Sequence, residues 1–325
     1  MQIKKVATWV SGLVLSLASI STLAQEFPAK PFRIIVPLVP GGGPSASATL
    51  FGEQMGALLK QPFVVDHRPG ASGVVAINEL MRSPADGYSL IVLDAGHWAI
   101  APAMQKNLPY EPQRDLAPIG SMYKAVQVIV VRSDFPAKDL NELIALARAK
   151  PGVLEYGVNG GGSTQQLIFE YFKAALKLQI QTIPYKGSAQ ALQSLLGGDV
   201  SIGCIGWNTA QPHVQSGKLR ALAVSMGKRG KQVPDIPTVA EITGLSDFDF
   251  AGELGMFVRG GTPQPIVDKL VVAFRAAAAN PDLIAKSFKG GQTIEPSTPA
   301  ELSQTINADL IRYRQAVKAA GLAPT

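Results

Sequence analysis

Short apolar runs alternate with helical patterns along most of the chain. The run Arg-Ile-Ile-Val at residues 33–36 has the length of a buried strand. After the glycines at 41–43, apolar residues recur on one helical face: Leu50, Phe51, Met55, Leu58 and Leu59. Further strands are predicted at 63–65, 90–93, 126–131, 154–158, 182–185, 200–205 and 219–224, and further helices at 139–149, 189–196, 265–279 and 299–320. This alternation predicts an α/β fold.

Two glycine-rich segments each join a predicted strand to a predicted helix. The first contains Pro40, Gly41, Gly42, Gly43 and Ser45, and the second contains Asn159, Gly161, Gly162, Ser163 and Thr164. A glycine loop before a helix presents free backbone N–H groups and the positive end of the helix dipole, which together favour an anion. Because the two loops lie about half a chain apart, one in each lobe would hold a small anion from both sides. The alternative is that each glycine run is only a tight turn.

A third segment follows a predicted strand in the same way. Asp94 and Ala95 come directly after the apolar run 90–93, and Trp98 follows them. In open α/β sheets, ligands bind beyond the carboxyl ends of the strands. We therefore expect this segment and the two glycine loops to face one site.

Residues 1–24 have the pattern of a signal peptide. Lys4 and Lys5 precede a small, apolar stretch at 6–20, and Thr-Leu-Ala at 22–24 ends it. The stretch is shorter than the roughly 20 apolar residues of a membrane span. We expect cleavage after Ala24 without lipid attachment, since no cysteine is nearby, and export to the periplasm in a bacterium. About 300 residues remain, a length that favours two lobes over one core.

The charge does not indicate a nucleic-acid partner. The formal net charge is +6, and +4 without Lys4 and Lys5. Basic residues are scattered, with the densest group at 228–231 and no interleaved aromatic residues. The single cysteine, Cys204, lies in an apolar run, so we expect a buried small hydrophobic residue and no intrachain disulfide.

No catalytic or cofactor motif stands out. The three histidines, His67, His97 and His213, have no metal-ligand spacing, and the glycine loops match neither the dinucleotide pattern nor a P-loop. There is no G-x-S-x-G elbow. A periplasmic hydrolase that uses Ser163 with His97 is the enzyme alternative, although nothing in the sequence orients that pair as a triad requires. We expect neither catalysis, a cofactor nor a metal.

Several motifs, in order and spacing, resemble one family across essentially the whole mature chain. They lie at residues 27–37 (FPAKPFRIIVP), 41–43, 67–73 (HRPGASG), 108–110, 184–187, 217–224, 235–241 (DIPTVAE) and 261–263. The chain thereby resembles the Bug-type solute receptors of tripartite tricarboxylate transporters.

The resemblance implies a type II-like periplasmic binding protein of two α/β lobes joined by crossing strands. Residues 25–124 and 248–325 would form the first lobe and residues 125–247 the second. Such a receptor, expected to be a monomer without a cofactor, closes on a small carboxylate and passes it to a membrane permease pair. A receptor that presents its ligand to a signalling kinase is an alternative that the sequence does not separate from transport.

The sequence differs from the family pattern at positions that are expected to contact the ligand. Pro44 and Ser45 stand where Thr-Asp usually follows the glycines, and Ile205 stands at a frequent aspartate position. Asp94 replaces a small polar residue, Trp98 a histidine and Glu253 a tryptophan. We therefore expect an aromatic or amphiphilic carboxylate, with an amide or amine that meets Asp94 or Glu253. Selectivity is assigned to Asp94, Trp98, Trp207, Asn208 and Glu253, and Tyr185 is expected to reach the cleft.

Each of these side chains also has a purely structural interpretation. Trp98 and Trp207 would stack a ligand ring or belong to the core. Asp94 would cap a helix, Glu253 would lie on the surface or be paired, and Tyr185 would pack. Ser163 and Thr164 are expected to serve both as a helix cap and as ligand donors.

Overall fold

The computed structural model describes residues 27–38, 40, 43–159, 163–185, 188–289 and 292–322. The predicted signal peptide and its cleavage after Ala24 lie outside the described residues. So do four of the predicted anion-binding residues, Gly41, Gly42, Gly161 and Gly162, and nothing is described of the Asn159 side chain.

The first of two sheets has five strands in the order β2-β1-β3-β10-β4. They are β2 (Phe63–His67), β1 (Phe32–Val36), β3 (Ser89–Asp94), β10 (Gly252–Arg259) and β4 (Leu116–Ala125). Strand β1 is parallel to both of its neighbours, whereas β10 is antiparallel to β3 and β4. A strand from late in the chain is thus inserted between two early ones.

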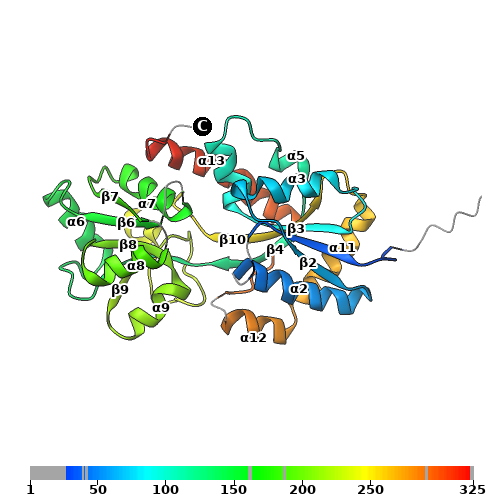
Figure 1. The fold of residues 1–325 in the computed structure, drawn as a ribbon. Helices are drawn as coiled ribbons and strands as arrows, with labels where there is room; N and C mark the ends of the chain where they lie inside the picture. Colours follow the sequence, from blue (N-terminus) through cyan, green and yellow to red (C-terminus); the bar gives the residue numbers. More distant parts are fainter. Residues whose placement is uncertain are drawn as a thin grey trace, which may run out of the picture.

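The second sheet has the order β7-β6-β8-β5-β9. Its strands are β7 (Gln181–Tyr185), β6 (Glu155–Asn159), β8 (Ile202–Gly206), β5 (Gln127–Arg132) and β9 (Leu219–Val224). Strand β6 is parallel to its neighbours, and β5 is antiparallel to both of its own. The two sheets stand side by side, joined by the chain on either side of Val126 and on the approach to β10 (Figure 1). The predicted lobe boundaries stay a prediction.

Helices cover both sheets (Figure 1). With the first sheet lie α2 (Gly43–Leu59), η1 (Ala71–Gly73), α3 (Val74–Arg82), η2 (Gly96–Ile100), α4 (Ala101–Met104), α5 (Pro112–Asp115), α11 (Gln264–Ala278) and α12 (Pro281–Lys289). With the second lie α6 (Leu140–Ala149), α7 (Thr164–Ala175), α8 (Ser188–Gly197), α9 (Trp207–Gln215) and α10 (Val239–Thr243). Helix starts carry the capping residues that stabilise them. Asp139 accepts a hydrogen bond from the Glu142 N–H at 2.9 Å, and Thr238 with Glu241 forms a capping box.

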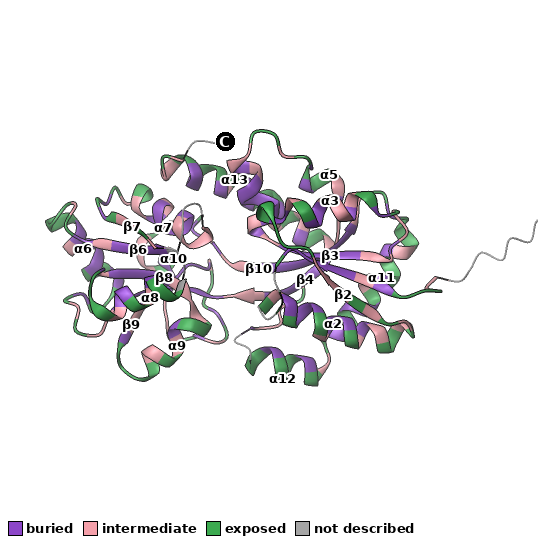
Figure 2. Cartoon of the chain, in the orientation of Figure 1, coloured by how far each residue is buried: buried purple, intermediate pink, exposed green. Residues whose placement is uncertain are grey.

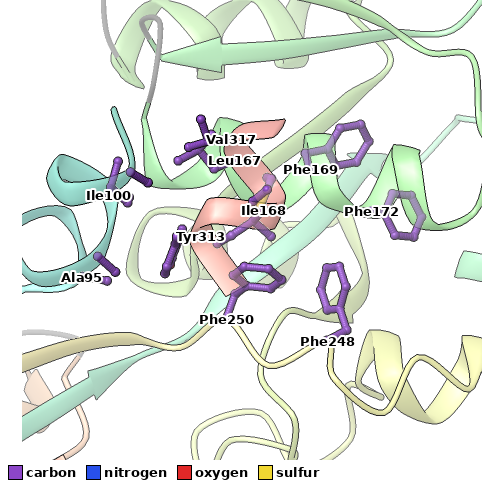
Figure 3. Close-up of a cluster of buried hydrophobic side chains, with 14 of the residues drawn as sticks. Ala95, Ile100, Leu167, Ile168, Phe169, Phe172, Phe248, Phe250, Tyr313 and Val317 are labelled. Carbon is purple, nitrogen blue, oxygen red and sulfur yellow. The ribbon is translucent and has the colours of Figure 1, made fainter. Parts of the chain in front are cut away.

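The closing helix α13 (Pro299–Ala319) touches both halves of the molecule. It packs against η2 and β4 of the first sheet and against α7 beside the second. Figure 3 shows Tyr313 and Val317 of α13 beside Leu167 and Ile168 of α7. The Phe250 ring, just before β10, lies 5.4 Å from the Tyr313 ring in an edge-on arrangement. One apolar core therefore continues from one lobe into the other.

Burial follows the strand pattern expected for sheets with helices on both faces. The middle residues of β1, β3, β5 and β10 are buried, and exposed residues gather on the outer helix faces (Figure 2). Of the helices in the described residues, none has the length and hydrophobicity required to cross a membrane.

Candidate functional site

A cavity of about 330 Å³ lies between the two sheets, beyond the ends of β6 and β8. The first lobe contributes Gly43, Pro44, Tyr123 and Gln292, and the crossing segment contributes Ala125, Val126 and Gln127. The second lobe contributes Gly157, Gln165, Ala191, Cys204, Ile205, Gly206, Trp207, Asn208 and Thr209. No charged side chain is among these described lining residues. We call this cavity the neutral end of the cleft.

Two further cavities continue the cleft along the crossing strands. One of about 150 Å³ shares Tyr123, Gln127 and Gln165 with the neutral end, and adds Asp94, Ala95, Thr164, Gly252 and Glu253. The next, of about 490 Å³, shares Asp94 and Thr164 and reaches His97 and Ser163. We call the 150 Å³ cavity the acidic end of the cleft. Gly43, Ser163, Thr164, the end of β3 and the crossing segment thus border one continuous cleft.

Amide side chains line the neutral end. The Nε2 of Gln165 on α7 donates to the Oε1 of Gln127 on β5 at 3.4 Å. Gln292, from the segment before α13, accepts at Oε1 from the buried Ser47 hydroxyl at 2.8 Å. Its Nε2 lies against the start of α2, where a Cβ at position 43 would come within 2.6 Å of it. A side chain at position 43 would therefore require the Gln292 amide to shift.

Asp94 at the end of β3 is anchored by its own loop. Its Oδ1 accepts from the Gly96 N–H at 2.9 Å and lies 2.7 Å from His97 Nδ1. Burial works to raise the pKa of Asp94, but the His97 charge and these hydrogen bonds outweigh it and lower the pKa. The side chain stays 43 % exposed. Asp94 is thus an ionised group that both organises its loop and faces the cleft.

Glu253 on β10 lies at the junction of the cleft and the crossing strands. The residue is only 3 % exposed, yet it lines the acidic end and, with Lys124, two further cavities. Burial raises the pKa of its carboxyl group. Within the described part of the chain, Glu253 forms no salt bridge. The interpretation of Glu253 as a surface residue is therefore wrong.

Eight of the predicted site residues line the cleft. They are Gly43, Asp94, Ala95, Ser163, Thr164, Trp207, Asn208 and Glu253. Ser163 also caps α7, since its Oγ accepts from the Gln166 N–H at 3.3 Å. Asp94 accepts a hydrogen bond from the Gly96 N–H at the start of η2 and also lines the cleft. Its structural interpretation and its cleft-facing interpretation are therefore compatible. Whether these residues bind ligand stays a prediction.

Four predicted contacts line none of the three cavities of the cleft. Trp98 is fully buried, and its Nε1 donates to Asp309 Oδ2 at 2.9 Å, so its assignment as a ligand-stacking ring is wrong. The Tyr185 hydroxyl hydrogen-bonds Ser194 Oγ, and the residue lines none of the three cavities above. Ser45 is buried, with its hydroxyl 3.3 Å from His67 Nε2. Pro40 is an exposed turn residue outside these cavities.

Sequence reasoning missed the polar residues of the crossing region. Tyr123, Gln127, Gln165 and Gln292 line the neutral end but lie in no recognisable motif. Gln165 directly follows Thr164, so its helix position was a usable signal, whereas Gln292 comes close only through the fold. Cys204 is buried as predicted, and burial raises the pKa of its thiol to about 12, although it also borders the cavity.

Comparison with known proteins identifies the family. The family described as "Tripartite tricarboxylate transporter family receptor" matches residues 48–322. The chain belongs to this receptor family. The resemblance found in the sequence is thereby confirmed, as is the two-lobed α/β binding-protein fold. This receptor is a solute-binding protein.

Individual relatives cover nearly the whole receptor. A UPF0065 protein of Bordetella pertussis is 34% identical over 306 residues, which are 94% of this chain and 92% of the relative. The structure of Rpa4515 from R. palustris with adipate is 29% identical with a TM-score of 0.74, over 92% of this chain and 100% of the other. MatC from Rhodopseudomonas palustris with bound malate is 29% identical with a TM-score of 0.70, over 90% and 100%.

The hydrolase alternative gains no support from the site. His97 pairs with Asp94, but no hydrogen bond of the described residues joins Ser163 to His97. Across those same residues, no group of three or more His, Cys, Asp or Glu side chains is placed to hold a metal ion. The family model describes a transporter receptor, and solved relatives include a periplasmic binding protein and a TctC solute-binding protein.

Proposed function

We propose that the receptor captures a small carboxylate by closure of its two lobes and delivers it to the permease pair of a tripartite tricarboxylate transporter. The observation that carries the proposal is the cleft itself, whose walls come from both sheets and from the crossing segment. Adipate and malate in the solved relatives support a carboxylate as the ligand class.

The carboxylate would be held by backbone N–H groups of the two glycine loops. Helices α2 and α7 begin directly after those loops, so their N-termini point their dipoles toward the cleft ends that Gly43 and Thr164 line. Each hydrogen bond to a charged oxygen contributes about 1.5–3 kcal/mol. The neutral end offers only uncharged donors and acceptors, so binding would depend on hydrogen bonds rather than on a cationic side chain.

The remaining cleft residues would set the ligand class. Trp207 and Ile205 offer apolar surface at the neutral end, which suits an aromatic or amphiphilic ligand. Asp94 and Glu253 occupy the acidic end, where a second carboxylate would be repelled and an amide or amine would be accepted. The preferred ligand would then be a carboxylate that also carries an N–H donor.

The N-terminal segment is proposed to be an export signal. Residues 1–24 would direct the receptor to the periplasm and be removed after Ala24, and the mature receptor would act as a monomer. Intact mass of protein secreted by a bacterial host measures the cleavage, and a mature chain beginning at Gln25 is expected.

The ligand is found by native mass spectrometry of protein from its host, followed by a thermal-shift screen. The panel contains malate, adipate, the monoamide of adipate, benzoate and 4-aminobenzoate. A ligand at 100 times its dissociation constant adds about 2.7 kcal/mol to the free energy of unfolding, which gives a clear shift. Response to one carboxylate class supports the proposal. Silence across the panel together with turnover of an ester or amide would replace it with the hydrolase.

A further inference from the structure

The side-chain amide of Gln292 is buried where α2 begins and the neutral end of the cleft opens. The residue is 8 % exposed and comes from the segment before α13, yet it lines the cavity together with Gly43 and Tyr123. None of the described lining residues of that cavity is charged. An anion bound there must therefore be held by neutral hydrogen-bond donors, so a side chain whose donor end is fixed toward the cavity bears directly on binding.

Ser47 fixes the orientation of this amide. Ser47 is fully buried on α2, and its hydroxyl donates to Gln292 Oε1 at 2.8 Å. Rotation of the amide by half a turn would leave the buried hydroxyl hydrogen without this acceptor, which is unfavourable. The hydrogen bond therefore keeps Oε1 toward the helix and Nε2 away from Ser47.

The Nε2 end lies beside the cavity. A Cβ atom at position 43 would be 2.6 Å from Nε2 and 3.7 Å from the Tyr123 hydroxyl oxygen. Gly43 and Tyr123 both line the cavity, whereas Ser47 does not. Burial raises the pKa of the Tyr123 hydroxyl, and a hydrogen bond from Gln292 opposes the rise. Because an amide nitrogen carries two hydrogens, Nε2 can donate to Tyr123 and to a ligand at the same time.

The backbone around Gln292 is held without the help of its side chain. The Gln292 N–H donates to the Ser287 carbonyl of α12 at 3.0 Å, and the Lys124 N–H of β4 donates to the Thr293 carbonyl at 3.2 Å. A structural tie to α2 would need only the bond between Oε1 and Ser47. The donor end at the cavity is left over by that structural role, which indicates a contact with ligand.

We infer that Gln292 is a ligand-binding residue whose Nε2 donates a hydrogen bond to a carboxylate oxygen at the start of α2, and that Ser47 is the positioning residue that keeps this donor in place. The inference rests on the proposed function, because it takes the ligand to be a carboxylate bound in this cleft. It gives the neutral end a preference for an acceptor. A carboxylate offers only acceptors, whereas a primary amide offers both kinds of group, so the carboxylate is favoured.

Titration calorimetry of the mature chain with Gln292→Glu tests the donor. Glutamate has nearly the same shape and still accepts from Ser47, but it turns a carboxylate oxygen rather than an N–H group toward the cavity. At neutral pH, affinity for the tightest carboxylate of the panel should fall by about tenfold or more, because repulsion replaces a charge-assisted hydrogen bond. The same ligand with every carboxyl group converted to a primary amide should bind the variant more tightly than it binds wild type.

Gln304→Glu is the matched control for the added charge, because Gln304 is exposed on α13 and lines none of the three cleft cavities. It should bind both ligands as wild type does. Equal losses of affinity in the two variants would overturn the inference. So would an amidated ligand that binds Gln292→Glu no more tightly than wild type. Thermal melts confirm that each variant is folded.

Gln292→Leu removes the donor without adding a charge, and it should lower affinity for the carboxylate by about tenfold. Unchanged affinity in this variant would overturn the role of Gln292. Ser47→Ala frees the amide to rotate, so it should weaken carboxylate binding by about threefold in wild type and cause no further loss in Gln292→Leu. An equal loss in both backgrounds would show that Ser47 acts on the fold and not through Gln292.

Failure of this inference is distinct from failure of the proposed function. If no carboxylate binds wild type, the proposed function fails. A carboxylate that binds wild type and the Gln292 variants alike leaves the proposed function standing and overturns only the assignment of Gln292.

Discussion

The two ends of the cleft present polar groups by different means. At the neutral end, the polar groups are the uncharged amides of Gln127, Gln165 and Gln292, which are partly engaged with one another and with Ser47. At the acidic end, Asp94 and Glu253 are chemically alike, and their surroundings shift their pKa values in opposite directions, down for Asp94 and up for Glu253. The comparison teaches that a residue's type predicts its chemistry poorly when burial and partners decide its charge.

The two tryptophans follow the same division. Trp207 begins α9 and lines the neutral end, whereas Trp98 lies in the core behind the acidic end with its Nε1 bonded to Asp309. Burial raises the pKa of Asp309 to about 7, because the ionised carboxylate is costly in this environment. The hydrogen bond from the Trp98 indole opposes this by stabilising the ionised form. The acidic end therefore depends on core packing and the neutral end does not.

The largest expected effect is that of Trp98→Ala. Loss of a fully buried aromatic side chain lowers the free energy of unfolding by about 3–5 kcal/mol, and Asp309 also loses its donor. Urea unfolding followed by far-UV circular dichroism measures it. In the matched variant Trp207→Ala we expect about 1 kcal/mol, with the larger effect on ligand affinity. Equal losses of stability in the two variants would contradict the division.

Gln292→Leu tests the anchoring of the neutral end. The substitution leaves the fully buried Ser47 hydroxyl without its acceptor, which costs about 1–3 kcal/mol of unfolding free energy. Urea unfolding again measures the change. The double variant Ser47→Ala with Gln292→Leu removes both partners and should recover part of the loss. If the double variant is as destabilised as the sum of the two single variants, the bond is not coupled as the structure shows.

Asp94 and Glu253 are expected to change stability with pH in opposite directions. The lowered pKa of Asp94 means that its stabilising contribution is present above the unfolded value, about 3.9, and is lost as pH falls through the folded pKa. Asp94→Asn should therefore be less stable than wild type at pH 7, by about 1 kcal/mol given its solvent exposure, and equal to it in acid.

The raised pKa of Glu253 has the reverse consequence. Wild type loses stability as pH rises from about 4.3, the unfolded value, through the folded pKa, because the buried group resists ionisation. Glu253→Gln should therefore melt at a higher temperature than wild type at pH 7 and at the same temperature in acid. Melting curves from pH 3 to 8 compare both variants, and parallel curves for the two would contradict the assignment of charge.

The smallest expected effect is that of Ser45→Ala. The Ser45 hydroxyl is hydrogen-bonded to His67 Nε2, and His67 Nδ1 lies 2.9 Å from the Leu38 carbonyl oxygen. Its removal should cost about 0.5–1.5 kcal/mol of stability and leave ligand affinity nearly unchanged. Thermal melts and the calorimetric titration measure the two quantities. A large loss of affinity with little change in stability would restore Ser45 as a ligand contact.

Much of the architecture was predictable from the sequence because local patterns carry it. The apolar run at 33–36, the glycines before α2 and the Gly-Gly pair that ends α8 depend on burial, backbone freedom and capping within a few residues. Ser163 and Thr164 were assigned to a helix start near the site for the same local reason, and the structure places them there.

The charge and exposure of the cleft residues were decided only by the tertiary structure. Trp98 and Trp207 look equivalent in the sequence. In the structure, Trp98 is buried against Asp309 of α13, whereas Trp207 is half-buried and lines the cleft. Gln292 reaches Gly43 across nearly the whole chain, and Glu253 is buried because β10 is inserted between β3 and β4. The sequence by itself determined most strands and helices, the family and the segments expected to face a ligand. Which side chains those loops meet depends on contacts between distant segments, and these exist only once the chain is folded.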